Sequence, residues 1–180
     1  MTEQIQLPRL TSGDVVDLIL ADHRTFEDLL RTLRDSTTDR DAARQAFATL
    51  HVAHAEAEEL KVYPTLRRKD AISEHDEDHG EEEHAEGHEA LLDVLEAEDL
   101  EGADFDELVE KLAEVVNHHL TEEELTILNP AREDVDAEVR HRLGADFVEE
   151  RNRLIDEGCG DIENVRAIVV EAEEKGLLEG

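Results

Sequence analysis

The feature that most constrains the fold is an internal repeat with a period of 65 residues. Segment 54–64, HAEAEELKVYP, returns at 119–129 as HLTEEELTILN, so a His and a Glu four residues apart occur twice. The superimposed polar pairs are His23 with His88, His54 with His119, and Glu58 with Glu123. The superimposed apolar pairs are Phe26 with Leu91, Leu30 with Leu95, Phe47 with Leu112, Leu50 with Val115, and Tyr63 with Leu128. A repeat of this length predicts two helical hairpins related by an approximate two-fold axis.

Apolar residues recur at helical spacing in four stretches joined by short polar segments, which predicts four long helices. The predicted helices cover about residues 14–35, 39–62, 81–98 and 104–128. In this interpretation Pro64 ends or kinks the second helix, and the acidic run SEHDEDHGEEE links it to the third. Asp104 and Glu107 are predicted to form a capping box at the fourth helix.

The predicted fold class is all-α, an up-and-down four-helix bundle with one or two additional C-terminal helices. We divide the chain into an N-terminal arm at 1–13, the bundle at 14–130 and a C-terminal helical extension at 131–180. Aromatic residues make up only 3% of the chain, so the core is expected to consist of Leu, Val, Ala and Ile.

The charge of the chain argues against two classes of partner. With 50 acidic and 18 basic residues, the net charge is −32, which repels phosphate backbones and anionic lipid heads. We therefore expect neither a nucleic-acid nor a membrane partner. The start MTEQIQLPRL does not have the pattern of a secretion signal. Cys159 stands alone and cannot form an intrachain disulfide, which favours the cytoplasm.

Seven His and Glu side chains fall on the apolar stripes of the four helices, where the core should lie. Residues four apart on a helix lie about 40° apart, so both can bind one ion. The candidate metal ligands are His23, His54, Glu58, His84, His88, His119 and Glu123. Burying two carboxylates and five imidazoles without a cation would be costly. Seven ligands exceed what one ion uses, so two ions are expected, with Fe, Mn, Zn, Cu and Ni all left open.

Several nearby residues are expected to have other roles. His119 is favoured over His118 because it lies closer to the apolar stripe and coincides with the repeat. His75 and His79 are expected at the surface, within the acidic link, and at most as a loose metal-loading patch. Tyr63 lies half a turn from His54 and is expected to serve in packing.

Four segments together resemble the hemerythrin-like, or HHE cation-binding, domain. They are LADHRTFEDLL, HAEAEELKVYP, HAEGHEALL and HLTEEELTIL, and the resemblance covers about residues 14–130. It implies a cofactor of two non-haem iron ions joined by an oxo or hydroxo group. In the implied ligand set, His84, His88 and His119 bind one iron, His23 and His54 bind the other, and Glu58 and Glu123 bridge them.

The resemblance implies a protein that binds dioxygen or another diatomic ligand such as NO, for carriage, storage or sensing. One alternative is a di-iron oxidoreductase that acts on peroxide or NO. Another is a bundle that buffers metal or is held together by zinc. The extension at 131–180 lies outside the resemblance, and a homodimer formed through it is an expectation as well.

Overall fold

A computed structural model describes residues 4–179, and over that range the chain is helical and contains no strands. The predicted all-α class is confirmed, as are the two helices after Pro130. The long helices are α1 (Val15–Arg34), α2 (Arg40–Ala57), α4 (Glu74–Glu96), α5 (Ala103–Glu123), α7 (Ala137–Asp156) and α8 (Ile162–Glu174). The short elements are η1 (Glu58–Val62), α3 (Tyr63–Arg68), η2 (Glu124–Leu128) and α6 (Asn129–Asp134).

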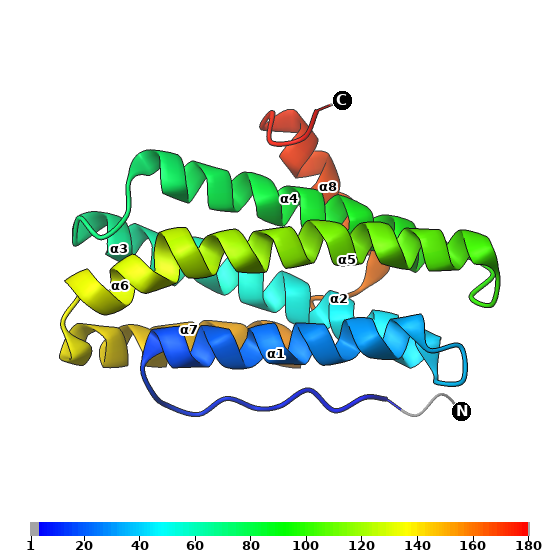
Figure 1. Cartoon of the computed structure of the whole chain (residues 1–180), viewed down its shortest axis with the longest axis horizontal. Coiled ribbons are helices and arrows are strands. Elements are labelled where there is room, and N and C mark those ends of the chain that lie inside the picture. The colour runs from blue at the N-terminus through cyan, green and yellow to red at the C-terminus, as the bar shows by residue number, and fades with distance from the viewer. Residues whose placement is uncertain (1–3, 180) are drawn as a thin grey trace.

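Helices α1, α2, α4 and α5 run along the long axis of the molecule, as does α7, and the chain reverses direction from each of the first set to the next (Figure 1). Helix α1 packs against α2 and α5, while α4 packs against α5 and α2. This arrangement is consistent with a helical bundle built from two hairpins. Helix α7 lies against α1 and α2, and α8 packs against α4.

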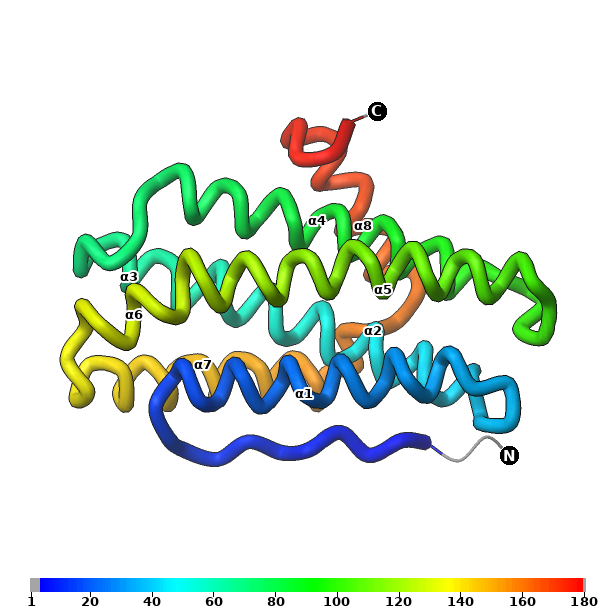
Figure 2. The backbone as a smooth tube through the Cα atoms, in the orientation of Figure 1, coloured from blue at the N-terminus to red at the C-terminus, as the bar shows by residue number. Residues whose placement is uncertain are grey.

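The N-terminal segment is extended and follows the bundle before α1 begins (Figure 2). Its backbone carbonyls at Pro8 and Leu10 accept hydrogen bonds from the side chains of Arg151 and Asn152 on α7. Helix α1 then starts as predicted, because the carboxylate of Asp14 accepts a hydrogen bond from the backbone of Val16 and caps the first turn.

The start of the third long helix was predicted too late. Helix α4 begins at Glu74, because Ser73 and Asp76 form a reciprocal capping box with the backbone. The acidic run is therefore the first part of the helix. Its carboxylates stabilise the helix because they lie near the positive N-terminal end of the helix dipole. The capping box predicted at Asp104 was also wrong, since Gly102 is the N-cap of α5 and Asp104 lies in its first turn.

Each hairpin contains one π-helical turn, and neither proline ends its helix. In η1 the backbone N–H of Tyr63 bonds to the carbonyl of Glu58, five residues earlier, and Pro64 follows at the next position. Proline lacks an N–H and crowds the carbonyl four residues before it, so a wider turn relieves that conflict. The same arrangement recurs in η2, before Pro130. Helical structure thus continues to Arg68 and to Asp134.

The core consists of two apolar clusters with a layer of polar residues between them. Towards the α1–α2 connection the cluster includes Phe26, Leu30, Phe47, Leu50, Leu91, Leu95, Phe105 and Leu112. Towards the opposite end it includes Val15, Ile19, Tyr63, Leu66, Ile127, Leu128, Leu143 and Phe147. Buried histidines and carboxylates lie at the level between the clusters, as His23 does between Ile19 and Phe26.

Candidate metal centre

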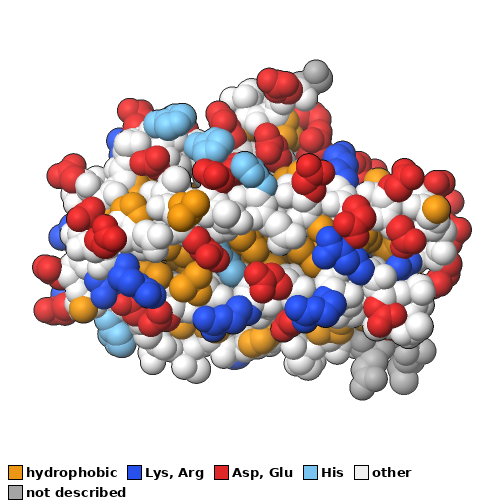
Figure 3. Space-filling model, in the orientation of Figure 1, with side chains coloured by type: hydrophobic (Ala, Val, Ile, Leu, Met, Phe, Trp, Pro, Cys, Tyr) orange, Lys and Arg blue, Asp and Glu red, His pale blue; other side chains and the backbone are white. Residues whose placement is uncertain are grey.

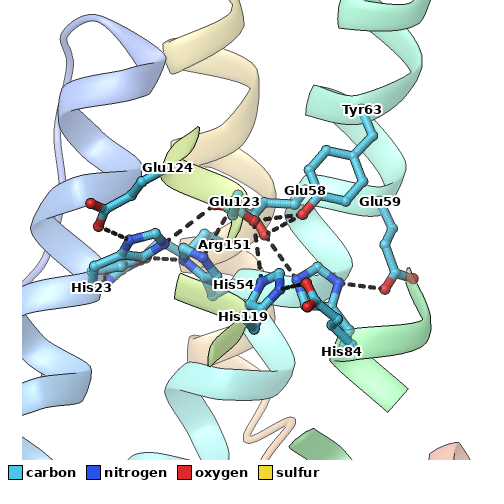
Figure 4. Close-up of polar contacts among 12 residues, drawn as sticks. His23, His54, Glu58, Glu59, Tyr63, His84, His119, Glu123, Glu124 and Arg151 are labelled. Atoms are coloured by element: carbon cyan, nitrogen blue, oxygen red, sulfur yellow. Dashed lines mark hydrogen bonds and ion pairs between the residues drawn. The ribbon is translucent and has the colours of Figure 1, made fainter. Parts of the chain in front are cut away.

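Six of the seven candidate ligands come together in the interior, in two groups that share both glutamates (Figure 4). The first group is His23, His54, Glu58 and Glu123, and the second is Glu58, His84, His119 and Glu123. Within each group, one ligand atom from every residue lies within 4.8 Å of the others, and all members are buried. The second helix of each hairpin supplies a His and a Glu, and the first helix supplies a His.

Each glutamate directs one oxygen towards each group. Glu58 Oε1 lies 3.0 Å from His54 Nε2, and its Oε2 lies 3.1 Å from His84 Nε2. Glu123 Oε1 lies 3.3 Å from His23 Nε2, and its Oε2 lies 3.2 Å from His119 Nε2. A carboxylate with one oxygen in each of two ligand groups has the position of a bridge between two ions.

The other nitrogen of each of these histidines is held by a carboxylate. The Nδ1–carboxylate distances are 3.0 Å from His23 to Glu124, 2.9 Å from His54 to Asp22, 2.7 Å from His84 to Glu59, and 2.8 Å from His119 to Glu83. A carboxylate at Nδ1 fixes the proton there and leaves the lone pair of Nε2 free, as is usual for histidines that bind metal. The sequence signal was an acid directly before His23 and His84 and directly after Glu58 and Glu123.

The atoms that face the centre fit a cation. None of the four Nε2 atoms has a hydrogen-bond partner among residues 4–179, and the same holds for Oε1 of Glu58 and of Glu123. With protons fixed on the Nδ1 atoms, each short Nε2–carboxylate contact would set lone pair against lone pair. A buried polar atom without a partner costs free energy, and a cation between these atoms removes that cost.

The electrostatics of the metal-free centre point the same way. Burial acts to lower the pKa of His54, but the nearby charge of Glu58 and the hydrogen-bonded carboxylate of Asp22 raise it to about 10. Burial acts to raise the pKa of Glu123, yet the imidazoles of His119 and His23 beside its two oxygens hold it well below its ordinary value. The centre thus binds a proton at His54 near neutral pH, and a metal cation would displace it.

The carboxylate that supports His54 is itself fixed by a residue from the C-terminal extension. Arg151 on α7 donates from Nε and from a terminal nitrogen to the two oxygens of Asp22, each at 2.8 Å. Both side chains are almost completely buried. Sequence reasoning missed this pair because the two residues lie 129 positions apart and no local pattern connects them.

Tyr63 does more than pack. Its hydroxyl lies 2.6 Å from Glu123 Oε2, to which it donates, and 3.3 Å from Glu58 Oε2. In a regular helix a residue five positions after Glu58 would lie about 140° around the axis. The π turn brings Tyr63 back over Glu58 instead, and a side chain at Gly80 would collide with its ring, since a Cβ there would lie 2.9 Å from it.

His88 is the candidate ligand that the structure places outside both groups. Its ring packs edge-on against His51, with 4.6 Å between the ring centroids, and its Nε2 has no hydrogen-bond partner in the described chain. Burial and the neighbouring His84 lower the pKa of His88 to about 4. The histidines are therefore grouped two and two, where the resemblance implied three and two.

The repeat register explains the placement of His88. The second helices of the hairpins correspond at the 65-residue offset, which pairs His54 with His119. In the first helices of the hairpins, the residues with equivalent contacts are His23 and His84. They are 61 positions apart, which is about one helical turn shorter than the 65-residue offset. Outside the centre, His118 and His75 are exposed, as expected, and His79 is half-buried. His75 and His79 lie on helix α4 and not in a link before it.

The comparisons with known proteins found a matching family model and a similar curated protein. The DNA nickase of Nostoc sp. strain PCC 7120 is 26% identical over 144 residues, which is 78% of this chain but only 40% of that protein. No solved structure matches the chain significantly. No helix in the described residues is long and apolar enough to cross a membrane. The family model for the hemerythrin HHE cation binding domain matches residues 14–131, and the chain belongs to that family.

Proposed function

We propose that this chain is a non-haem di-iron protein that binds O2 or NO for carriage, storage or sensing. The observation that carries the proposal is the pair of glutamates, each with one oxygen towards each pair of histidines. We take the six grouped residues as the ligands and the four long helices as an up-and-down bundle around them. Two redox-active ions held in this way would supply a site at which a diatomic ligand binds and exchanges electrons.

The surrounding residues favour binding over turnover in water. The centre lies between two apolar clusters, and all six ligands are buried. Apolar clusters on both sides exclude water from a bound gas molecule and strengthen the electrostatic interactions within the centre. The carboxylates at the four Nδ1 atoms hold the imidazoles in one tautomer and one orientation.

The experiment is to load the full chain with iron, reduce it without oxygen, and mix it with air while recording the visible absorption. The proposal predicts charge-transfer bands that appear with oxygen and disappear when oxygen is removed, over repeated cycles. Rapid and permanent conversion to a ferric spectrum on mixing with air would contradict it.

That contrary result would support the second candidate, a di-iron oxidoreductase acting on peroxide or NO. Tyr63 favours this candidate, because its hydroxyl is a proton donor in contact with both glutamates. Burial and the two carboxylates raise the pKa of Tyr63 well above its ordinary value, so it keeps its proton. Replacing Tyr63 with Phe should slow peroxide consumption if the enzyme reading holds.

The proposal does not extend to DNA. The activity in the name of the Nostoc relative belongs to a protein of which this chain covers 40%, and a net charge of −32 opposes binding to a phosphate backbone. We propose the cytoplasm as the location because the free Cys159 fits a reducing compartment. A homodimer through 131–180 remains a prediction, and within the chain α7 packs on α1 and α2.

A further inference from the structure

Residues 4–10 form an extended segment, here called the strap, that runs along the bundle before α1 begins (Figure 2). Two buried side chains of α7 hold its backbone. Arg151 donates to the carbonyl of Pro8 at 3.0 Å, and Asn152 donates to the carbonyl of Leu10 at 2.9 Å. The strap sequence QIQLPRL contains no acidic residue, and the lower edge of Figure 3, along which it runs, shows few acidic side chains. Its docking on a chain of net charge −32 is therefore not opposed by like charges.

The strap is fixed at one end and loosely held along its length. At the fixed end, Gly13 has a φ of +149°, and a Cβ on Gly144 of α7 would lie 2.1 Å from its carbonyl oxygen. Within residues 4–179, no backbone group of the strap bonds to the backbone of another residue. The ion pair between Arg9 and Asp156 is more than half exposed on both sides and adds little. A segment with so few hydrogen bonds can open locally while the bundle stays folded.

A pocket of about 560 Å³ separates part of the strap from α2 and α7, and the buried Arg151 contributes to its lining. The same guanidinium that holds Pro8 pairs with both oxygens of Asp22, each at 2.8 Å. Asp22 Oδ2 in turn lies 2.9 Å from His54 Nδ1. The strap is thus three contacts away from a candidate metal ligand. Glu83, the equivalent carboxylate of the other hairpin, lies on α4, which contributes no residue to this pocket.

We propose that the strap is a releasable cover of Arg151, and that its docking is coupled to the occupancy of the metal centre. When the strap leaves, Arg151 loses the carbonyl of Pro8, and water reaches the guanidinium that fixes Asp22. Loss of a contact that orients a metal-binding histidine commonly lowers metal affinity by about 10- to 100-fold, so the released state should bind metal less tightly. A bound cation must then favour the docked strap by the same factor. The coupling does not depend on which gas or substrate the centre takes.

Cleavage by trypsin after Arg9 measures release, because the strap must leave the surface before the protease can bind it. The full chain is digested with and without Zn²⁺ as the probe cation, and elemental analysis gives the zinc bound per chain. Mass spectrometry follows cleavage after Arg9 and after Arg44, which lies within α2 and becomes accessible only when the bundle unfolds. We expect cleavage after Arg9 to be the faster of the two, and bound zinc to slow it by at least about five-fold.

Two matched pairs of variants locate the coupling. Asp22→Asn and Glu83→Gln each remove the charge of one carboxylate behind a histidine, and at saturating zinc only Asp22→Asn should abolish the protection of the strap. Asn152→Ala should speed cleavage of the metal-free chain and weaken zinc binding, because Leu10 loses its donor. Asn164→Ala should change neither, since that side chain bonds to the connection between α7 and α8.

Three results would overturn the proposal. They are cleavage after Arg9 that is no faster than after Arg44, bound zinc that leaves cleavage after Arg9 unchanged, and equal protection in Asp22→Asn and Glu83→Gln. If Asp22→Asn does not fold, equal zinc affinity in Asn152→Ala and Asn164→Ala has the same force. The readout is cleavage and zinc content, so a chain whose strap zinc protects but which binds no gas would refute the proposed function alone. A chain that binds no cation at all would refute both.

Discussion

The two halves of the metal centre have nearly the same ligands but opposite surroundings. In the first half, Asp22 behind His54 is sealed by Arg151, which comes from a helix outside the residues matched by the family model. In the second half, Glu83 behind His119 faces two histidines that reach the surface. The C-terminal extension therefore covers one half of the centre, whereas the carboxylate behind the other half contacts partly exposed histidines of the bundle itself.

Arg151 gives the strongest test of that difference. Arg151→Met would leave the carboxylate of Asp22 buried without its cation, so we expect the free energy of unfolding to fall by about 3–5 kcal/mol. Arg153→Met is the matched control, because Arg153 lies on the same helix in exposed ion pairs and should cost about 1 kcal/mol or less. Denaturant unfolding of the metal-free chains measures the free energy of unfolding of both variants. Equal losses would show that the contact of Arg151 with Asp22 has no special role in stability.

In the metal-free chain, pH should change the free energy of unfolding in opposite directions through His88 and through His54. His88, beside the second half, has a folded pKa of about 4, below the value of about 6.5 in an unfolded chain. The unfolded state therefore binds more protons between these values, and stability falls by about 3 kcal/mol as the pH drops from 6.5 to 4. His54, in the first half, has a folded pKa raised to about 10, so its contribution is present below pH 6.5 and is lost as the pH rises towards 10.

Unfolding of the native chain and of His88→Leu at pH 7 and pH 4.5 tests this prediction. The variant should lose less stability on acidification than the native chain, because no neutral imidazole remains at that position to be protonated on unfolding. His141→Leu, at an exposed site, should follow the native chain. The same acid sensitivity in all three chains would show that His88 is not held neutral by burial.

Tyr63 connects the halves, and its removal should have the smallest effect. Tyr63→Phe removes the hydroxyl that donates from the first hairpin to Glu123 of the second, at a cost of about 1.5–3 kcal/mol for a hydrogen bond to a charged group. In the iron-loaded chain the charge-transfer bands should shift as well, since Glu123 loses a donor. Leu128→Ile, at the matching repeat position, should leave the bands in place. Unshifted bands in Tyr63→Phe would show that this hydroxyl does not affect the metal centre.

Most of the fold and all six grouped ligands could be predicted, because they depend on local periodicity. His54, Glu58, His119 and Glu123 follow directly from helical spacing and from the 65-residue repeat. The contacts that the sequence did not indicate lie where the helix departs from that period or where distant segments meet. A π turn carries Tyr63 to the glutamates, and a displacement of one turn on α4 puts His84 in the place that the repeat gave to His88.

The supporting contacts divide in the same way. The acids beside the histidines and glutamates form a visible pattern, in which Asp22 and Glu83 precede His23 and His84. No such pattern identifies Arg151, because its contact with Asp22 exists only after α7 has packed against α1 and α2. The start of α4 depended on which of several acidic or polar residues captured the first free backbone N–H groups, and Ser73 and Asp76 do so. Helix α5 begins after Gly102 without any side-chain cap.

The most direct test of the central claim is elemental analysis of the full chain purified from iron-replete cells, together with His119→Ala and His118→Ala. We expect about two irons per chain in the native protein and in His118→Ala, because His118 lies outside both ligand groups. We expect a clear loss of iron in His119→Ala, whose Nε2 faces the shared carboxylate of Glu123. Zinc in place of iron, or equal metal loss in both variants, would contradict the account.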